Sequence, residues 1–230
     1  MKIIWLGHAS FRIEIGDQVL LLDPWLRGNP AFPEARRAEA LRGATAVLVT
    51  HGHGDHAADG PEICRELRIR LCGIYDLTSY LGAKHGIETV GFNKGGTIRL
   101  GNVAVTMVNA THSSSAATGA GPVYLGHESG YMIAGEGRTI YASGDTDVMA
   151  DMGVFQALHQ PEIGILNCGG HFTMDMRRAA YAAKTFFAFK TVIPAHYRTF
   201  PLLEQSAEVL KAELPGVNVI EPEVLVPIEL

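Results

Sequence analysis

The stretch Ala46-Val47-Leu48-Val49-Thr50-His51-Gly52-His53-Gly54-Asp55-His56 decides how this chain is interpreted. Its first four residues are apolar and two of them are β-branched, which is typical of a buried strand. Four side chains that can bind metal follow within six positions, namely His51, His53, Asp55 and His56. Imidazole and carboxylate groups together suit Zn²⁺ and its first-row neighbours. Because neighbouring side chains in an extended loop diverge, the stretch predicts that these ligands divide between two metal ions.

Composition narrows the class of protein. The chain has 230 residues, of which 47% are hydrophobic and 19% charged, as expected of an α/β protein with a sizeable core. No apolar run approaches the roughly 20 residues that cross a bilayer, so no membrane segment is expected. The net charge of −5 lacks the basic excess of nucleic-acid binding proteins, although it does not exclude a small anionic substrate.

The two remaining clues to cellular context are the N-terminus and the cysteines. Residues 1–8 contain no signal-peptide pattern, and they are predicted to contain the first strand. Cys64, Cys72 and Cys168 form no Cys-x-x-Cys pair. They are therefore predicted to be buried free thiols in a reducing cytoplasm.

Apolar patterning predicts alternating strands and helices without repeats or linkers, and hence a single domain over residues 1–230. Strands are expected at 2–6, 10–15, 18–22, 46–49, 70–74, 87–91, 97–100, 103–109, 123–127, 129–134, 139–143, 162–167, 191–195, 217–220 and 224–228. Helices are expected at 34–42, 58–68, 75–85, 147–158, 175–188 and 202–213. A proline-rich loop is expected at 24–33, and a mobile flap or plain linker of small residues at 113–122. Antiparallel meanders flanked by β–α alternation indicate two mixed sheets with helices outside.

Four further polar side chains stand where predicted strands end: Asp23, His112, Asp145 and His196. A lone histidine at a strand end is more often structural than functional. The interpretation changes when several follow a His-x-His-x-Asp-His loop in one chain, because strand ends gathered at one sheet edge bring distant ligands together.

The ordered set resembles the five-motif pattern of the metallo-β-lactamase superfamily over nearly the whole chain. The chain more closely resembles the small bacterial metal-dependent hydrolases related to ascorbate-6-phosphate lactonases. The stretches that carry this closer resemblance are Trp5–Phe11, His112–Ser115, Asn167–Met174 and Ile193–Tyr197. The resemblance implies the metallo-β-lactamase fold, an α/β four-layer αβ/βα sandwich of two mixed β-sheets with outer helices. Its site would lie at one end, between the sheets.

The resemblance also implies a ligand set for two divalent metal ions. His51, His53 and His112 would bind the first ion, and Asp55, His56 and His196 the second, with Asp145 bridging the two. Zn²⁺ suits this set best, while Mn²⁺, Fe²⁺ and Ni²⁺ stay open. With two carboxylates and a bridging hydroxide, the ions would leave a local charge of about +1, which favours an anionic substrate.

These features predict a hydrolase whose metal-bridging hydroxide attacks an ester, lactone or phosphodiester bond in a small substrate. Two alternatives stay open: a di-iron redox enzyme on the same fold, and an inactive metal-binding module. A homo-oligomer is also left open, since compact enzymes often form symmetric assemblies.

Six side chains near the expected site have open roles. Asp55 is a candidate proton acceptor, although a metal-bound carboxylate is a poor base and the ligand role is preferred. Asp23 either holds a metal-binding histidine or forms an Asx turn before a proline. His8 could lie beside the metals, where it would contact a metal ligand or the substrate, or it could simply be packed at a strand edge. His171 is a candidate proton donor to the leaving group, at a position where close relatives usually carry Asn. Tyr197 and Arg198 are candidate substrate contacts, and either side chain could equally be structural or exposed.

Overall fold

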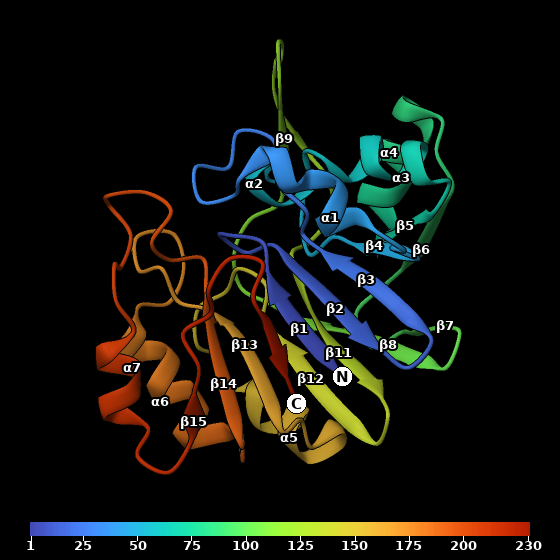
Figure 1. Ribbon diagram of the computed structural model, residues 1–230. Helices are drawn as coiled ribbons and strands as arrows, with labels where there is room; N and C mark the ends of the chain where they lie inside the picture. The colour runs from blue at the N-terminus through green and yellow to red at the C-terminus, as the bar shows by residue number, and fades with distance from the viewer.

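Two seven-stranded sheets face one another in the computed structural model, which describes residues 1–230 (Figure 1). The first sheet contains, in spatial order, β16 (Pro227–Glu229), β1 (Lys2–Trp5), β2 (Phe11–Ile15), β3 (Gln18–Leu22), β4 (Ala46–Leu48), β5 (Arg70–Ile74) and β6 (Thr89–Phe92). The second contains β15 (Asn218–Val219), β14 (Thr191–Ala195), β13 (Ile163–Asn167), β12 (Arg138–Ala142), β11 (Ser129–Gly135), β8 (Val103–Asn109) and β7 (Thr97–Leu100).

Each sheet is half antiparallel and half parallel. Strands β16, β1, β2 and β3 pair antiparallel, whereas β3, β4, β5 and β6 pair parallel. In the second sheet β7, β8, β11 and β12 are antiparallel, and β12, β13, β14 and β15 are parallel. Parallel neighbours need a crossover, usually helical, so the parallel halves coincide with the β–α alternation of the sequence.

Helices cover the outer faces of the parallel halves (Figure 1). The helices on the first sheet's side are α1 (Arg37–Leu41), which follows a 3-10 turn at Glu34–Arg36, α2 (Gly54–Ala57), α3 (Gly60–Leu67) and α4 (Tyr75–His85). Those beside the second sheet are α5 (Asp151–His159), α6 (Met176–Phe186) and α7 (Glu208–Glu213). This arrangement confirms the predicted four-layer sandwich.

The sheets share one core of 60 buried apolar side chains. In β2, for example, Phe11, Ile13 and Ile15 alternate along the strand and are all buried, as the two-residue period of a strand requires. Helix α6 begins at Asp175, whose side chain accepts a hydrogen bond from the Arg178 backbone N–H. The three cysteines are buried free thiols, as predicted.

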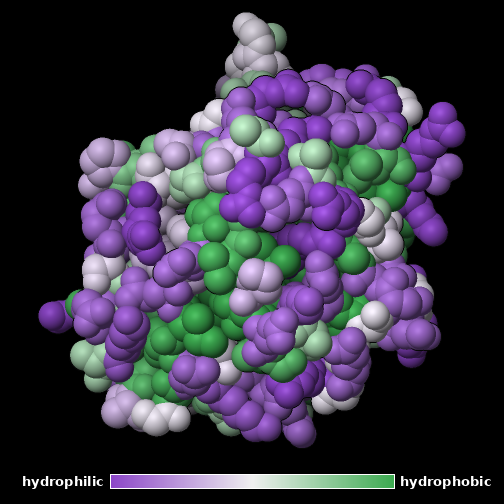
Figure 2. Space-filling view, viewed as in Figure 1, coloured by the Kyte–Doolittle hydropathy of each residue, from purple (hydrophilic) through white to green (hydrophobic).

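The structure differs from the sequence prediction in several segments. Residues 113–122, expected as a flap or linker, contribute to a hairpin of β9 (Ser115–Thr118) and β10 (Gly121–Tyr124) that projects from the molecule (Figure 1). In the space-filling view this hairpin is a narrow finger of mostly neutral colour above a largely polar surface (Figure 2). The 147–158 helix begins only at Asp151.

The helix expected at 202–213 begins at Glu208, because Gln205 binds the carbonyl groups of Phe200 and Leu203 and holds a turn instead. The metal-binding stretch is not wholly extended either, since Asp55 and His56 lie in α2. None of the helices combines the length and apolar character that a bilayer span would need.

Candidate metal centre

The polar residues at the strand ends meet at one edge of the two sheets. Three of the residues that turn the chain there, His8, Asp23 and His196, have φ values of 55°, 45° and 58°. This left-handed backbone is unfavourable for residues other than glycine. Such strain is concentrated at functional sites, where the surrounding structure holds it in place. Asp23 and His196 directly follow strands β3 and β14, and His8 lies three residues after β1.

One group of ligand atoms comes from His51, His53 and His112, whose candidate atoms lie within 4.8 Å of one another. The His51 Nε2 atom is 3.0 Å from His53 Nδ1. His51 is fully buried, while His53 and His112 are partly exposed. The structure therefore brings together the three side chains expected at the first metal.

A second group lies alongside and contains Asp55, His56 and His196, together with His8. The Asp55 Oδ2 atom is 3.6 Å from His196 Nε2 and 3.8 Å from His56 Nε2. Asp55 is the most exposed member, because its side chain retains 32% of its accessible surface. The three residues expected at the second metal are thus adjacent.

Asp145 stands between the two groups. Its Oδ2 atom lies 3.2 Å from His196 Nε2, 3.3 Å from His56 Nε2, 3.6 Å from His112 Nε2 and 3.9 Å from His51 Nε2. Zinc–nitrogen bonds of about 2.0–2.1 Å at tetrahedral angles would separate neighbouring ligand atoms by roughly 3.3 Å. A carboxylate at these distances from both groups is suited to bridge two cations.

The hydrogen-bond pattern fits metal ions at this position. The Thr50 hydroxyl donates its proton to Asp23 Oδ2 at 2.7 Å, so the Thr50 oxygen accepts from His51 Nδ1 at 3.0 Å. His56 Nδ1 donates to Asp23 Oδ2 at 2.8 Å. Neutral His51 and His56 rings consequently carry their lone pairs on Nε2. The Nε2 atoms of His56 and His196 are buried without a hydrogen-bond partner and face carboxylate oxygens, an arrangement that a cation would stabilise.

The pKa values of the clustered groups in the absence of metal also indicate that positive charge is favoured at this position. Burial opposes ionisation of Asp145, but His196 and His56 outweigh it and hold the pKa of this carboxyl well below its usual range. Burial also disfavours the charged form of His196, yet Asp145 and Asp55 raise its pKa to about 9. Burial lowers the pKa of His51 well below its usual value. The carboxylates therefore stay charged and hold protons on nearby rings.

Several residues that position the ligands had no assigned role in the sequence analysis. Asn167 is buried and its Nδ2 donates to Asp145 Oδ1 at 2.6 Å, which leaves Oδ2 facing the histidines. Thr50 and Thr199 each contact a histidine Nδ1. Asn167 ends a buried strand, the same signal that identified Asp145. Asp23 accepts from His56 Nδ1, as expected of a residue that holds a metal-binding histidine, and also from the Thr50 backbone N–H.

Gly169 supports His196 rather than lining a substrate path. A Cβ atom at Gly169 would overlap the His196 carbonyl oxygen. The loop after β13 therefore passes so close to the end of β14 that only glycine fits. The group that lies closest to Gly169 is therefore protein backbone.

Three candidate site residues are placed away from the cluster. His171 is exposed, with its ring against Phe172, and lines an open depression of about 560 Å³ with Leu202 and Glu204. Tyr197 is fully buried and stacks on Trp5, so its side chain packs in the core. The Arg198 guanidinium lies over the same two rings and makes no hydrogen bond to the histidines.

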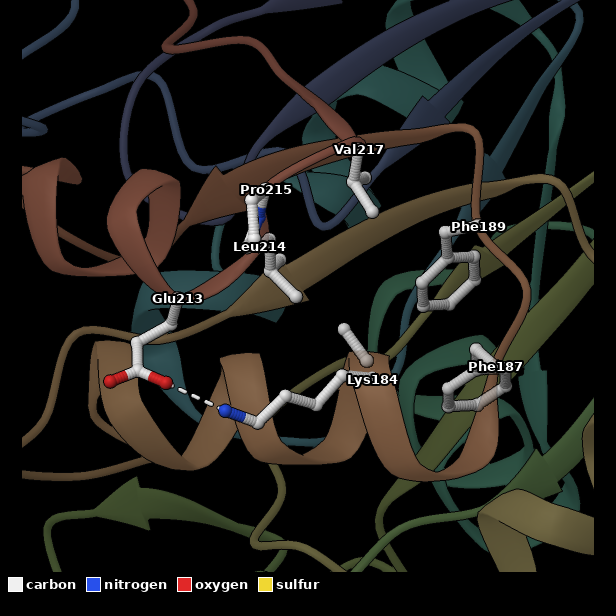
Figure 3. Close-up of a pocket in the computed structure, with 8 residues that line it drawn as sticks. Lys184, Phe187, Phe189, Glu213, Leu214, Pro215 and Val217 are labelled. Atoms are coloured by element: carbon white, nitrogen blue, oxygen red, sulfur yellow. Dashed lines mark hydrogen bonds and ion pairs between the residues drawn. The ribbon is translucent and has the colours of Figure 1, made fainter.

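Another hollow of about 300 Å³ lies between α6, α7 and the loop before β14 (Figure 3). Phe187, Phe189 and Leu214 line it, and Lys184 pairs with Glu213 across its mouth at 2.6 Å. None of the clustered histidines or carboxylates contributes to it. This hollow is therefore separate from the metal centre.

Comparison with known proteins agrees with this geometry. The family model described as "Beta-lactamase superfamily domain" matches residues 18–197. The chain belongs to the β-lactamase superfamily. Within this superfamily it is 68% identical, over the full length of both chains, to a UPF0173 metal-dependent hydrolase of Dinoroseobacter shibae. These relationships identify it as an enzyme, a metal-dependent hydrolase.

Two solved structures show the same architecture. Igni18, a metallo hydrolase from Ignicoccus hospitalis, superimposes with a TM-score of 0.83 at 30% identity, covering 100% of this chain and 98% of that one. An isothiocyanate hydrolase from Delia radicum gut bacteria gives a TM-score of 0.81 over 100% of this chain and 99% of that one. At 17% identity, the second likeness concerns the fold alone.

Proposed function

We propose that the protein is a binuclear hydrolase that cleaves an ester, lactone or phosphodiester bond in a small anionic substrate. The observation that carries this proposal is the sharing of Asp145 between two groups of ligands, His51, His53 and His112 on one side and Asp55, His56 and His196 on the other. Zn²⁺ is the preferred metal for this mixed imidazole and carboxylate set.

When bound, two divalent ions would supply water of lowered pKa and a Lewis acid for the oxygen of the scissile group. The chain's own residues hold and orient that chemistry. Asn167 directs Asp145 toward both groups through its 2.6 Å hydrogen bond to Oδ1. Asp23 fixes the tautomer of His56. Because these partners are in place before substrate arrives, little reorganisation is needed during reaction.

Exposure indicates the side from which substrate enters. His51, His56 and His196 are buried, whereas His53, His112 and Asp55 are partly exposed. The accessible face of the centre is therefore the one formed by these last three side chains. The charge of the ions would exceed that of the carboxylates, so an anionic group is attracted there even though the whole protein carries −5.

An aromatic wall borders the centre beside Asp55. Trp25 lies in the proline-rich loop and Phe200 in the loop after β14, and their ring centroids are 6.0 Å apart. Both rings also meet His8, at 5.3 Å and 5.6 Å. These half-buried rings support a substrate with an apolar portion next to its anionic group. The buried free thiols support the further proposal of a reducing, cytoplasmic location.

The test combines metal analysis with a substrate panel. Protein purified without chelators should contain about two zinc or manganese ions per chain and hydrolyse members of an aryl ester, lactone and bis-aryl phosphodiester panel. Asp145→Asn should lose hydrolysis, while Asp147→Asn, which removes a surface partner of Arg178, should retain it. A fully loaded protein inactive on all three classes contradicts the proposal.

The same experiment separates the alternatives. Tightly bound iron with visible absorption and no hydrolysis would favour the redox enzyme. One metal or none, with no activity after reconstitution, would favour the inactive binding module.

A further inference from the structure

His8 lies inside the second ligand group, although it is not one of the seven ligands expected from the sequence. Its side chain is fully buried and its Nε2 atom is 3.0 Å from Asp55 Oδ2. Its ring centroid is 3.8 Å from that of His196. Its ligand atom lies within 4.8 Å of those of Asp55, His56 and His196. His8 Nε2 is thus as close to the other ligand atoms as a metal ligand would be.

The opposite side of the ring is already engaged. The Thr199 hydroxyl donates to the Tyr197 carbonyl oxygen at 3.2 Å, and its oxygen lies 2.9 Å from His8 Nδ1. Because the proton of the Thr199 hydroxyl is directed at the Tyr197 carbonyl oxygen, the hydroxyl oxygen accepts a hydrogen bond from His8 Nδ1–H. The lone pair of a neutral His8 ring is then on Nε2 and is directed at a carboxylate oxygen. The Nε2 lone pair of a buried ring 3.0 Å from a carboxylate oxygen is unfavourable unless a cation lies between them.

His51 and His56 show the same arrangement. In each, Nδ1 is held by an oxygen of Thr50 or Asp23, and Nε2 is directed into the cluster. Histidines that bind metal commonly have their second nitrogen fixed in this way. His8 therefore shares the orientation device of the expected ligands as well as their location.

We propose that His8 is a further direct ligand of the second metal ion, binding through Nε2 beside Asp55, His56 and His196. This inference rests on the metal binding assumed in the proposed function. With Asp145 it gives the second ion five protein ligands and leaves the first ion with His51, His53, His112 and Asp145. The second site should consequently load first and more tightly than the first site, which has one protein ligand fewer.

The decisive experiment detects the bond itself in the wild-type protein. Protein with ¹⁵N-labelled histidine is loaded with ¹¹³Cd, and scalar coupling between cadmium and imidazole nitrogens is recorded, since such coupling passes only through a coordinate bond. Six coupled imidazoles, His8 Nε2 among them, are expected from the six clustered histidines. Absence of coupling at His8 overturns the proposal and leaves His8 as a positioning partner of Asp55.

A binding measurement provides the second test. His8→Gly suits the positive φ at this position and removes the ligand. The tighter of two zinc affinities should fall at least about tenfold. The exposed-loop variant His127→Gly should bind as the wild type does. An unchanged tight site in folded His8→Gly protein contradicts the proposal.

The two proposals can fail separately. Cadmium coupling at His8 in a protein that hydrolyses nothing contradicts the proposed reaction alone. Hydrolysis by a protein without that coupling contradicts the ligand role of His8 alone.

Discussion

At the scale of single residues, the centre is organised by side chains that never need to touch a metal. Asp23, Thr50 and Thr199 each contact the Nδ1 atom of a buried histidine. Asn167 donates a hydrogen bond to the Asp145 carboxylate and orients it in the same way. Each contact selects one tautomer or one orientation, so the ligand atoms converge before any ion binds.

Replacing Asp23 with Asn should weaken metal binding without unfolding the protein. The amide places a donor where His56 Nδ1–H also donates, so the ring loses its preferred tautomer. Asn tolerates the positive φ of this position. We expect a loss of about 10–100-fold in zinc affinity, measured by competition with a chromophoric chelator. Asp17→Asn, in an exposed turn, is the control, and equal affinities in both variants would refute the role of Asp23.

Replacing Asn167 with Ala should reduce activity with little change in overall stability. Asp145 would lose its 2.6 Å hydrogen bond and could rotate away from the two ligand groups. A fall of about 10–100-fold in kcat/KM is expected, together with weaker binding of the second metal equivalent. Kinetics and metal titration on the same preparation check this, and wild-type values for both would refute it.

The raised pKa of His196 predicts a pH-dependent stability of the metal-free protein. The folded-state value of about 9 exceeds the ordinary value of 6.5, so the bound proton stabilises the folded state fully below pH 6.5. That contribution is lost as pH rises through 9. Thermal unfolding of chelator-treated protein should therefore show a midpoint that falls between pH 6.5 and 9. A constant midpoint over this interval, or the same slope in His196→Asn, would contradict the assignment.

At the scale of elements, strand ends and the loops that follow them create the site. Strands β4, β8, β12 and β14 each deliver a ligand at their carboxyl ends. The loop after β13 passes against the end of β14, and the His196 backbone N–H donates to the His8 carbonyl oxygen at 3.0 Å. The strands are fixed by their ladders, so the ligands are placed more accurately than free loops would allow.

Gly169→Ala should disrupt this contact between loop and strand. The new Cβ overlaps the His196 carbonyl oxygen, and backbone cannot yield as a flexible side chain would. A destabilisation of about 1–3 kcal/mol is expected, together with loss of zinc from the second site. Gly119→Ala, where a Cβ meets nothing within 4 Å, is the matched control. Equal thermal midpoints for the two variants would show that the loop relaxes.

At the scale of the whole molecule, the metal centre links the two sheets. Asp55 and His56 follow a strand of the first sheet, whereas Asp145 and His196 follow strands of the second. The sheets are also joined beside the centre, because Ser129 donates to the Thr50 carbonyl oxygen from both its backbone N–H and its hydroxyl. We therefore expect metal binding and the packing of the sandwich to be coupled.

Removal of the metals should destabilise the protein without unfolding it. The shared core of 60 apolar side chains persists, but stabilisation by ligand binding is lost, about 4 kcal/mol for one site at a free metal concentration 1,000-fold above Kd. Chelation should lower the midpoint of a single thermal transition, and added zinc should restore it. An unchanged midpoint, or separate transitions for the two sheets, would exclude coupling through the centre.

The amino-acid sequence by itself determined the layered fold and the identity of the clustered side chains. Buried strands followed by ligands are local patterns, and the His-x-His-x-Asp-His stretch places several ligands in one short segment. Most strands and helices were therefore predicted close to their observed bounds. The hairpin at Ser115–Tyr124 and the late start of α7 were not, because they depend on cross-strand pairing and on the contacts of Gln205.

Only the tertiary structure decided which polar residues act together. Tyr197 follows a candidate ligand in sequence, yet its side chain is directed into the core, while His171 is exposed. Asn167, 22 residues after Asp145, contacts that carboxylate directly, and Thr199 reaches His8 across 191 residues. Sequence patterns report the environment of each residue along its own element. Contacts between residues distant in sequence are set by how the two sheets pack, and it is that packing which brings these side chains into one centre.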